Sequence, residues 1–199
     1  MPTRSPGPAP ETRRSGARVY VRPPCKSDAR AFAAAVAASR GLHHPWVQPP
    51  AAPAAFAAYV ARFAGAQSRD PARATHVGLF VCRAADDAHV GVFNLSEIVR
   101  GNFQSAYLGY YGLSPHVGQG YMGEGLALTL TLAFRNLRLH RVEAGVQPAN
   151  ERSIALLRAA GFIREGCSRR YVKIAGRWRD HERWAILADD WRARRSRGR

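Results

Sequence analysis

The feature that most constrains the fold of this chain is a run of glycines between a β-type segment and a long apolar segment. Gly118, Gly120, Gly123 and Gly125 follow the β-rich residues 105–113 and precede Leu126. A turn that leads from a strand into a helix exposes unpaired backbone N–H groups, which attract phosphate together with the helix dipole. We therefore expect a strand–loop–helix unit that holds a phosphorylated ligand. A plain glycine-rich turn before a core helix is the alternative.

Two familiar phosphate loops do not fit this stretch. A P-loop needs Lys and then Ser or Thr after its last glycine, and Leu126 and Ala127 stand there instead. The spacing Gly118-x-Gly120-x-x-Gly123 matches a dinucleotide-binding fingerprint, with Glu143 at a later strand. That fold needs several further strand–helix units, whereas the residues after Glu143 indicate one helix and one hairpin. The sequence therefore disfavours both readings.

The rest of the chain mixes strands and helices. Three β-rich runs separated by turn residues, 76–83, 90–99 and 105–113, predict an antiparallel meander. Residues 126–137 alternate like a strand but also place apolar residues on one helical face, and we interpret them as a helix. Asn150 is the expected N-cap of a helix that ends at Gly161. The other expected elements are strands at 19–21, 142–146, 162–174 and 178–187, and helices at 27–39 and 53–65, the first stopped by Gly41.

Composition and charge narrow the class. The chain has 199 residues, of which 46% are hydrophobic and 22% charged, which is typical of one globular domain. We expect this domain at 17–191, between a disordered Pro/Arg-rich leader at 1–16 and a basic disordered tail at 192–199. The net charge of +16 favours an anionic partner such as a phosphorylated cofactor, RNA or a ribosome.

Cysteine usage and hydropathy suggest a cytoplasmic protein. Cys25, Cys82 and Cys167 form no C-x-x-C pair, so neither a disulfide framework nor a zinc site is expected. The N-terminal residues lack the apolar core of a signal peptide, and no apolar run is long enough to span a bilayer.

Six short stretches, in this order and spacing, carry a family resemblance. They are His44-Pro45-Trp46, Tyr107-Leu108-Gly109-Tyr110, the glycine loop from Gly118 to Leu126, Asn150-Glu151-Arg152-Ser153, Ala160-Gly161-Phe162-Ile163-Arg164-Glu165-Gly166 and Gly176-Arg177-Trp178-Arg179-Asp180-His181. From about Val19 to Trp191 the chain resembles the GNAT superfamily of N-acetyltransferases, in particular the RimJ/RimL-type ribosomal-protein-alanine N-acetyltransferases. The resemblance implies a mixed α/β fold with a mostly antiparallel sheet of six or seven strands, splayed at the fourth strand and flanked by about four helices.

The resemblance also implies acetyl-CoA as cosubstrate, with no metal. A backbone N–H near Tyr111 or Gly112 would meet the thioester carbonyl, and the loop from Gly120 to Gly125 would hold the pyrophosphate. Gly120 stands where the family usually has Gln or Arg, with Gln119 as its neighbour. The implied cofactor-binding residues are Tyr111, Gly112, Leu113, Gln119, Gly120, Tyr121, Met122, Gly123, Glu124, Gly125 and Asn150.

Acetyl transfer to an amine needs a neutral amine, donors for the developing oxyanion and a proton for the departing thiolate. By resemblance, Ser153 is the candidate general acid and Tyr171 its alternative. Glu97 is expected on the apolar strand face of Phe93 and Leu95, and such an acid is a candidate base. His44 and Trp46, with His43, are candidates for the amine pocket.

Each candidate residue also has a plainer structural reading. Asn150 and Ser153 can serve only as helix-cap residues, and Glu97 as an edge-strand glutamate. Tyr171 can lie at the edge of the core, and the loop histidines can be simply exposed. The basic stripe from Arg169 to Arg183 is either an rRNA-docking surface or a solvated face.

The expected acceptor is the N-terminal α-amine of a ribosomal protein, modified by a monomer or homodimer. An antibiotic or polyamine amine is the alternative acceptor, which the basic composition disfavours. A non-catalytic acetyl-CoA- or RNA-binding protein is a third hypothesis.

Overall fold

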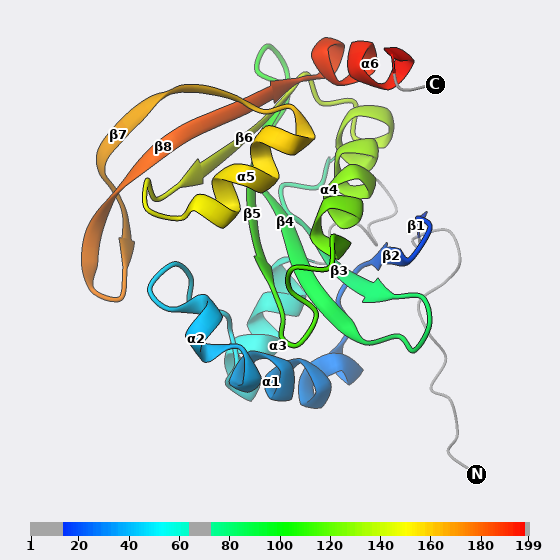
Figure 1. The fold of residues 1–199 in the computed structure, drawn as a ribbon, viewed down its shortest axis with the longest axis vertical. Helices are drawn as coiled ribbons and strands as arrows, with labels where there is room; N and C mark the ends of the chain where they lie inside the picture. The colour runs from blue at the N-terminus through cyan, green and yellow to red at the C-terminus, as the bar shows by residue number, and fades with distance from the viewer. Residues whose placement is uncertain (1–13, 64–72, 198–199) are drawn as a thin grey trace.

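A computed structural model describes residues 14–63 and 73–197. Its sheet has the strand order β1-β2-β3-β4-β5-β6-β8-β7 (Figure 1). The strands are β1 Arg14–Ser15, β2 Val19–Arg22, β3 Val77–Arg83, β4 His89–Val99, β5 Ser105–Gly112, β6 Arg141–Val146, β7 Ile163–Ile174 and β8 Arg177–Leu187. The helices are α1 Ala29–Ala38, α2 Arg40–His43, α3 Pro53–Arg62, α4 Tyr121–Thr131, α5 Glu151–Ala160 and α6 Ala188–Arg197, with a 3₁₀ turn at Lys26–Asp28 and a π-helical turn at Leu132–Asn136.

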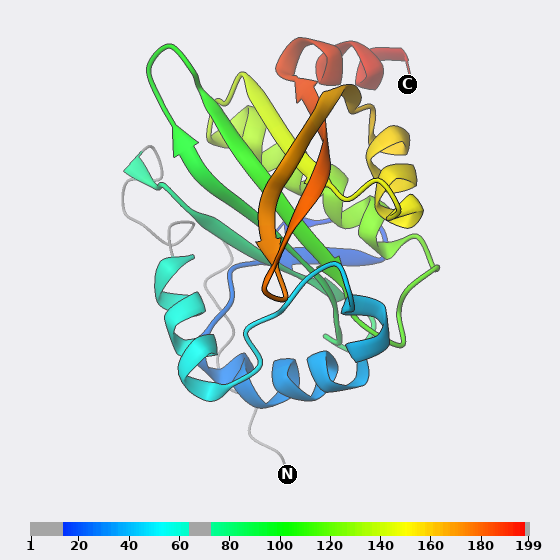
Figure 2. The ribbon, with the colours of Figure 1, turned by 90° about the vertical axis from the view of Figure 1, so that its left-hand side faces the viewer.

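Helices cover both faces of the sheet because successive strand residues point to opposite sides (Figure 2). On β4, Val92 belongs to a core with Phe32 of α1 and Phe56 of α3. Its neighbour Phe93 belongs to the other core, which includes Leu126 of α4 among its buried side chains. The predicted mixed α/β architecture is therefore confirmed.

The parallel contact between β5 and β6 positions the site. All other neighbouring strands pair antiparallel, and β5 pairs with β6 only from Ser105↔Arg141 to Tyr107↔Glu143. Beyond Tyr107 the two strands diverge, since β6 continues along β8 as far as Val146↔Glu182. The edge of β5 that faces β6 is consequently open from Leu108 to Gly112. This is the splay that the resemblance implied at the fourth expected strand.

Several element bounds differ from the sequence-based expectations. The sheet has an eighth strand because Arg14–Ser15 pairs with Tyr20 and Val21, which needs only backbone groups and no apolar side chains. This strand lies inside the expected leader, and the rest of that leader, residues 1–13, lies outside the described residues. Gly41 does not end the helical region, because α2 follows α1 directly. The predicted end of the next helix, at 64–65, also lies outside the described residues.

The C-terminal helix α6 occupies most of the expected tail. Trp191 is 5% exposed and its ring lies 5.3 Å from the ring of Phe134, which fastens the helix to the core. Asp189 and Asp190 lie in the first turn, where carboxylates are favoured by the helix dipole. The helix therefore continues through the arginine-rich residues to Arg197. Within the described ranges, none of the helices combines the length and apolar character needed to cross a membrane.

Candidate active site

A cleft of about 880 Å³ opens where β5 and β6 diverge. Its walls come from the end of β5, the loop and first turn of α4, the end of β6, the start of α5, the region around α2, and His181 of β8. The lining residues include Tyr110, Gly112, Tyr121, Gly123, Asn150, Ser153, His43, Trp46 and His181. The cleft therefore unites motifs that are far apart in the sequence.

The N-terminus of α4 presents unpaired backbone N–H groups to this cleft. Gly120 is the N-cap, with a φ of +82° that glycine adopts without strain, and no side chain caps the helix. Gly123 and Glu124 donate their N–H groups to the Gly120 carbonyl, whereas first-turn N–H groups such as that of Met122 have no partner within a helix. This end of α4 is consequently suited to an anion.

Arg18 lies beside the same helix end. Its guanidinium lies 4.9 Å from the centre of the Tyr121 ring and pairs with Glu124 at 2.5 Å. The backbone N–H of Arg18 also donates to Glu124 at 3.1 Å. Arg18 lies about a hundred residues before the glycine loop in the sequence, so no local pattern points to it.

Gly123 and Gly125, both in the first turns of α4, have different roles. A Cβ on Gly123 would meet no atom within 4 Å, and this residue lines the cleft. A Cβ on Gly125 would lie 2.8 Å from a Val81 methyl and 3.1 Å from the Phe93 ring. Gly123 thus leaves room in the cleft, and Gly125 lets α4 pack closely on the sheet.

The open edge of β5 offers hydrogen-bonding groups at the centre of the cleft. Leu113 donates its N–H to the Val90 carbonyl at 2.9 Å, on the β4 side. Because backbone groups alternate along a strand, the N–H groups of Tyr110 and Gly112 point to the opposite, open side. The Gly112 carbonyl accepts a hydrogen bond of 2.9 Å from His43 Nε2. The Gly112 N–H therefore faces the cleft, and His43 holds the next peptide unit, between Gly112 and Leu113.

Two hydroxyl groups meet on the α5 wall. The Ser153 and Tyr110 oxygens are 2.5 Å apart, and Tyr110 also lies 3.3 Å from the Ser153 carbonyl. Burial raises the pKa of Tyr110 although the hydrogen bond to Ser153 opposes the shift, so the phenol stays protonated. The Asn150 side chain caps α5 by accepting from the backbone N–H of Ser153 at 3.2 Å. The Ser153 hydroxyl takes no part in the cap.

His181 of β8 lines the same cleft as the hydroxyl pair. It is 5% exposed, and its Nδ1 lies 3.0 Å from the Arg179 carbonyl, which can only accept a hydrogen bond. Nδ1 therefore carries the proton, and a neutral ring leaves Nε2 as an acceptor. The ring edge lies 3.6 Å from the place of a Cβ on Gly145, a lining residue of the cleft.

The comparisons with known proteins agree with this geometry. Residues 18–163 match the family model described as "Acetyltransferase (GNAT) domain". The chain belongs to the GNAT acetyltransferase family.

Three GNAT relatives show the range of the similarity. The chain is 45% identical over 115 residues to "Probable N-acetyltransferase YjcK" of Bacillus subtilis, covering 58% of this chain and 62% of that protein. It is 41% identical over 107 residues to "[Ribosomal protein uS5]-alanine N-acetyltransferase" of Escherichia coli, covering 51% and 53%. The match therefore spans less than two thirds of these relatives. The structure of Mycobacterium smegmatis RimJ in complex with CoA-disulfide superposes with a TM-score of 0.78 at 28% identity, over 91% of this chain and 90% of that one.

The GNAT cleft contains most of the residues expected from the sequence, but not all of them. Tyr111, Gly112, Gly120, Tyr121, Met122, Gly123, Asn150, Ser153 and Trp46 line it. Leu113 does not, because it is fully buried in the core beneath α1 and α3. Glu124 is held by Arg18, and Gly125 packs against the sheet. The Gln119 side chain turns to the Pro115 carbonyl at 3.3 Å, so the geometry gives it no place in the lining.

Glu97 is the clearest correction. A bulge between Ser96 and Val99 breaks the alternation of β4, and Glu97 adopts a φ of +48°. Its side chain is 62% exposed, 3.4 Å from His76 and 3.6 Å from Arg62. The expectation that it shares the apolar face of Phe93 is wrong, and it lies near the end of β4 that pairs with the start of β5, away from the cleft.

Two other predicted site residues, His44 and Tyr171, lie outside the lining of the cleft. His44 is exposed and outside the lining, whereas His43 is 4% exposed and lies in it. Tyr171 is 39% exposed; its hydroxyl donates to Tyr107 at 3.4 Å and its ring packs edge-on against His181. Tyr171 is outside the lining, although its ring lies 3.8 Å from the place of a Cβ on Gly145, beside His181. Among the described residues, no group of His, Cys, Asp and Glu has the arrangement of a metal site.

Proposed function

We propose that this chain transfers the acetyl group of acetyl-CoA to the N-terminal α-amine of a ribosomal protein. The observation that carries the proposal is the meeting of the open β5 edge, the uncapped N-terminus of α4, a hydroxyl pair and a buried histidine in one cleft. The E. coli relative that acts on ribosomal protein uS5 supports the choice of acceptor. A ribosomal acceptor would place the reaction in the cytoplasm.

Acetyl-CoA would supply an activated acetyl thioester, and the chain would hold it at two places. Backbone N–H groups in the first turn of α4, including that of Met122, would receive the pyrophosphate, with Arg18 beside them. The open edge from Leu108 to Gly112 would pair with the amide groups of the pantetheine arm, as an added strand does. The Gly112 N–H would then face the thioester oxygen.

The chain's own groups would move two protons. His181 Nε2 would take the proton of the acceptor amine, since Nδ1 is committed to the Arg179 carbonyl. The Gly112 N–H would stabilise the oxyanion, and His43 would hold the adjoining peptide unit through the Gly112 carbonyl. No covalent bond to the enzyme is required, because the amine attacks the thioester directly.

The departing thiolate would receive its proton from Ser153. When the Tyr110 hydroxyl donates to Ser153 Oγ, the serine proton is free to point into the cleft. The buried Tyr110 would keep its proton and hold the Ser153 oxygen through this hydrogen bond, and the serine would regain its proton from water. Ser153 would act as the acid and Tyr110 as the residue that positions it.

The lining of the cleft favours a peptide amine over a polyamine. Among the described lining residues Glu151 is the only carboxylate, whereas a polyamine calls for several acidic groups. Leu42, Trp46 and Val47 add an apolar wall suited to a small first side chain such as alanine.

Mass spectrometry of ribosomal proteins from cells with and without this chain tests the acceptor. We expect one ribosomal protein to lose N-terminal acetylation when the chain is removed, and to regain it with the intact chain but not with Ser153→Ala. Unchanged acetylation of every ribosomal protein would contradict the ribosomal acceptor. Separate release of thiol from acetyl-CoA with a small amine would then favour the antibiotic or polyamine class.

A further inference from the structure

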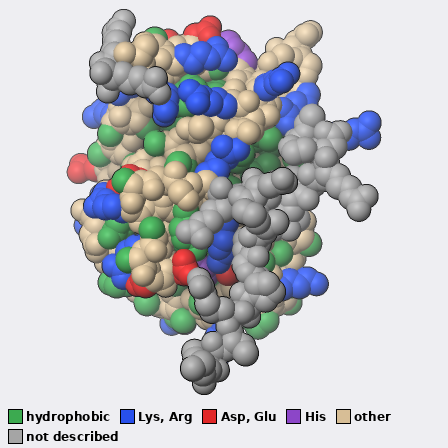
Figure 3. Space-filling model, turned by 90° about the vertical axis from the view of Figure 1, so that its right-hand side faces the viewer, with side chains coloured by type: hydrophobic (Ala, Val, Ile, Leu, Met, Phe, Trp, Pro, Cys, Tyr) green, Lys and Arg blue, Asp and Glu red, His purple; other side chains and the backbone are tan. Residues whose placement is uncertain are grey.

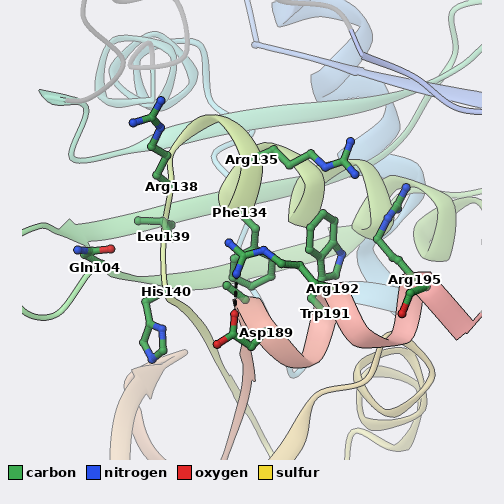
Figure 4. Close-up of a pocket in the computed structure, with 12 residues that line it drawn as sticks. Gln104, Phe134, Arg135, Arg138, Leu139, His140, Asp189, Trp191, Arg192 and Arg195 are labelled. Atoms are coloured by element: carbon green, nitrogen blue, oxygen red, sulfur yellow. Dashed lines mark hydrogen bonds and ion pairs between the residues drawn. The ribbon is translucent and has the colours of Figure 1, made fainter.

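A second cavity, of about 810 Å³, lies at the other end of β6 from the cleft (Figure 4). It is bounded by the π-helical turn after α4, the loop that leads into β6, and α6. The loop enters β6 at Arg141, whereas the cleft is lined by Gly145 and Val146 at the strand's far end. A six-residue strand spans roughly 20 Å. A ligand in this cavity would therefore leave the cleft free.

The cavity is strongly basic. Arg135, Arg138, Arg192 and Arg195 line it against one carboxylate, Asp189, which gives 4 − 1 = +3 charges. Asp189 pairs with Arg192 at 2.6 Å, and Figure 4 shows this contact on α6. Around α6, Lys and Arg side chains also gather in the upper part of the face seen in Figure 3. This local charge is part of the +16 of the whole chain.

Two of the arginines are held in place by a buried ring. The guanidinium of Arg135 lies 5.7 Å and that of Arg195 5.1 Å from the centre of the Trp191 ring. Contacts of this kind fix a guanidinium without neutralising it. In the described part of the chain, no carboxylate pairs with Arg135, Arg138 or Arg195. Their charge is therefore available to a ligand.

We propose that this cavity, lined by Arg135, Arg138 and Arg195, binds the phosphate backbone of RNA. The planar guanidinium of arginine can donate two parallel hydrogen bonds to the oxygens of one phosphate. Several arginines around one cavity suit a ligand that carries one negative charge on each of several phosphates. Gln104 and His140 in the same lining offer hydrogen-bonding groups for a ribose hydroxyl. A second copy of this chain is disfavoured as the occupant because it carries the same charge.

The inference adds a partner to the proposed function and rests on it only for the choice of RNA over an acidic protein. The N-terminus of a ribosomal protein lies near RNA in the ribosome. Binding at the far end of β6 would hold the enzyme there while the cleft receives the amine. The experiment below measures RNA binding without turnover, so the two proposals can fail separately.

Fluorescence anisotropy with a short labelled single-stranded RNA, over a series of salt concentrations, tests the site. The variant carries Arg135→Gln, Arg138→Gln and Arg195→Gln, and all three side chains are exposed. The matched control carries Arg169→Gln, Lys173→Gln and Arg177→Gln on the β7–β8 hairpin, which removes the same charge from another basic surface. Thermal melting checks that both variants are folded.

Loss of three phosphate contacts should reduce the slope of log K against log salt by about 2, since each contact with a single strand contributes about 0.7. Affinity should fall by about two orders of magnitude near 0.1 M salt and little near 1 M. The hairpin control should bind like the parent, and both variants should keep turnover on a short peptide. Restoring charge with Arg→Lys at the three sites should restore most of the slope.

Three results would overturn the proposal. Equal losses in the two variants would mean that RNA is held by diffuse charge, and an unaffected cavity variant would remove the site. Competition by poly-glutamate as effective as that by RNA would assign the cavity to an acidic protein segment. Loss of peptide turnover in the parent chain with intact RNA binding would instead contradict only the proposed function.

Discussion

Replacing Gly123 by valine should block acetyl-CoA binding without unfolding the chain. A Cβ at this position meets no atom within 4 Å, so the valine side chain fits the fold and extends into the cleft. It would take the space of a pyrophosphate at the end of α4. Glycine and valine differ in helix propensity by less than about 0.5 kcal/mol, so the free energy of unfolding should change little.

The loss of affinity follows from the contacts that valine would prevent. Hydrogen bonds to a charged group contribute about 1.5–3 kcal/mol each. Losing two of them would cost about 3–6 kcal/mol, which corresponds to a factor of about 10²–10⁴ in Kd. Calorimetric titration with CoA measures this change. Inhibition by pantetheine, which lacks the pyrophosphate, should be nearly unaffected.

Gly125→Ala is the matched control on the same helix. Its new methyl group would lie 2.8 Å from Val81 and 3.1 Å from Phe93, beneath α4 and not in the cleft. Overpacking typically costs about 1–3 kcal/mol, against a gain in helix propensity of about 1 kcal/mol. We expect a lower melting temperature with CoA affinity nearly kept. If Gly123→Val is folded and binds CoA as tightly as the parent, the assignment of the α4 terminus to the pyrophosphate is refuted.

Three further predictions concern the hydroxyl pair, the histidine and a buried ion pair. Ser153→Ala should lower kcat by a factor of about 10²–10⁴. CoA affinity and the melting temperature should not change, because the α5 cap uses the backbone N–H of Ser153 and not its hydroxyl. Stopped-flow measurement of thiol release checks kcat, and a decrease smaller than about threefold would exclude Ser153 as the acid. His181→Gln should lower kcat by a similar factor. Raising the pH should recover part of this loss, because the acceptor amine then loses its proton without a base. A kcat of the variant that does not change with pH would argue against His181 as the general base. Burial would raise the pKa of Asp28, but hydrogen bonds from Arg22, His89 and the Cys25 N–H lower it well below its usual range. This carboxylate therefore contributes stability above about pH 4 that is lost as the pH falls further. Asp28→Asn should lower the free energy of unfolding, measured in urea at pH 7, by about 3–5 kcal/mol. The difference in this free energy between the variant and the parent should become smaller below pH 4. A difference that does not change with pH would contradict the ion-pair account.

Local chemistry made much of the fold predictable. Asn150 and Gly161 bound α5 as expected, because side-chain capping and a left-handed C-terminal glycine act within one turn. The meander and the final hairpin also follow their turn residues. The start of α4 was placed too late, since residues 121–125 gave no apolar pattern and the helix begins where Gly120 turns left-handed.

The remaining site residues depend on pairing between distant segments. Glu97 was misplaced because a bulge in β4 arises from its pairing with β5, which period-two alternation cannot reveal. The sequence pattern assigns no role to His181, although its position beside Asp180 in a strand of alternating polarity is a usable signal. It enters the cleft because β8 extends beyond the last residue pair of β6. Tyr110 and Tyr111 point to opposite faces, and only the open edge of β5 distinguishes their roles.

The central claim is tested most directly by thiol release from acetyl-CoA with an alanine-starting peptide as acceptor. The parallel reactions use the same peptide with a formylated N-terminus, and spermidine. We predict stoichiometric release of CoA thiol and acetylated peptide with the free N-terminus, and neither product with the blocked peptide or spermidine. Thiol release that needs no free α-amine, or that occurs only with spermidine, would contradict the account.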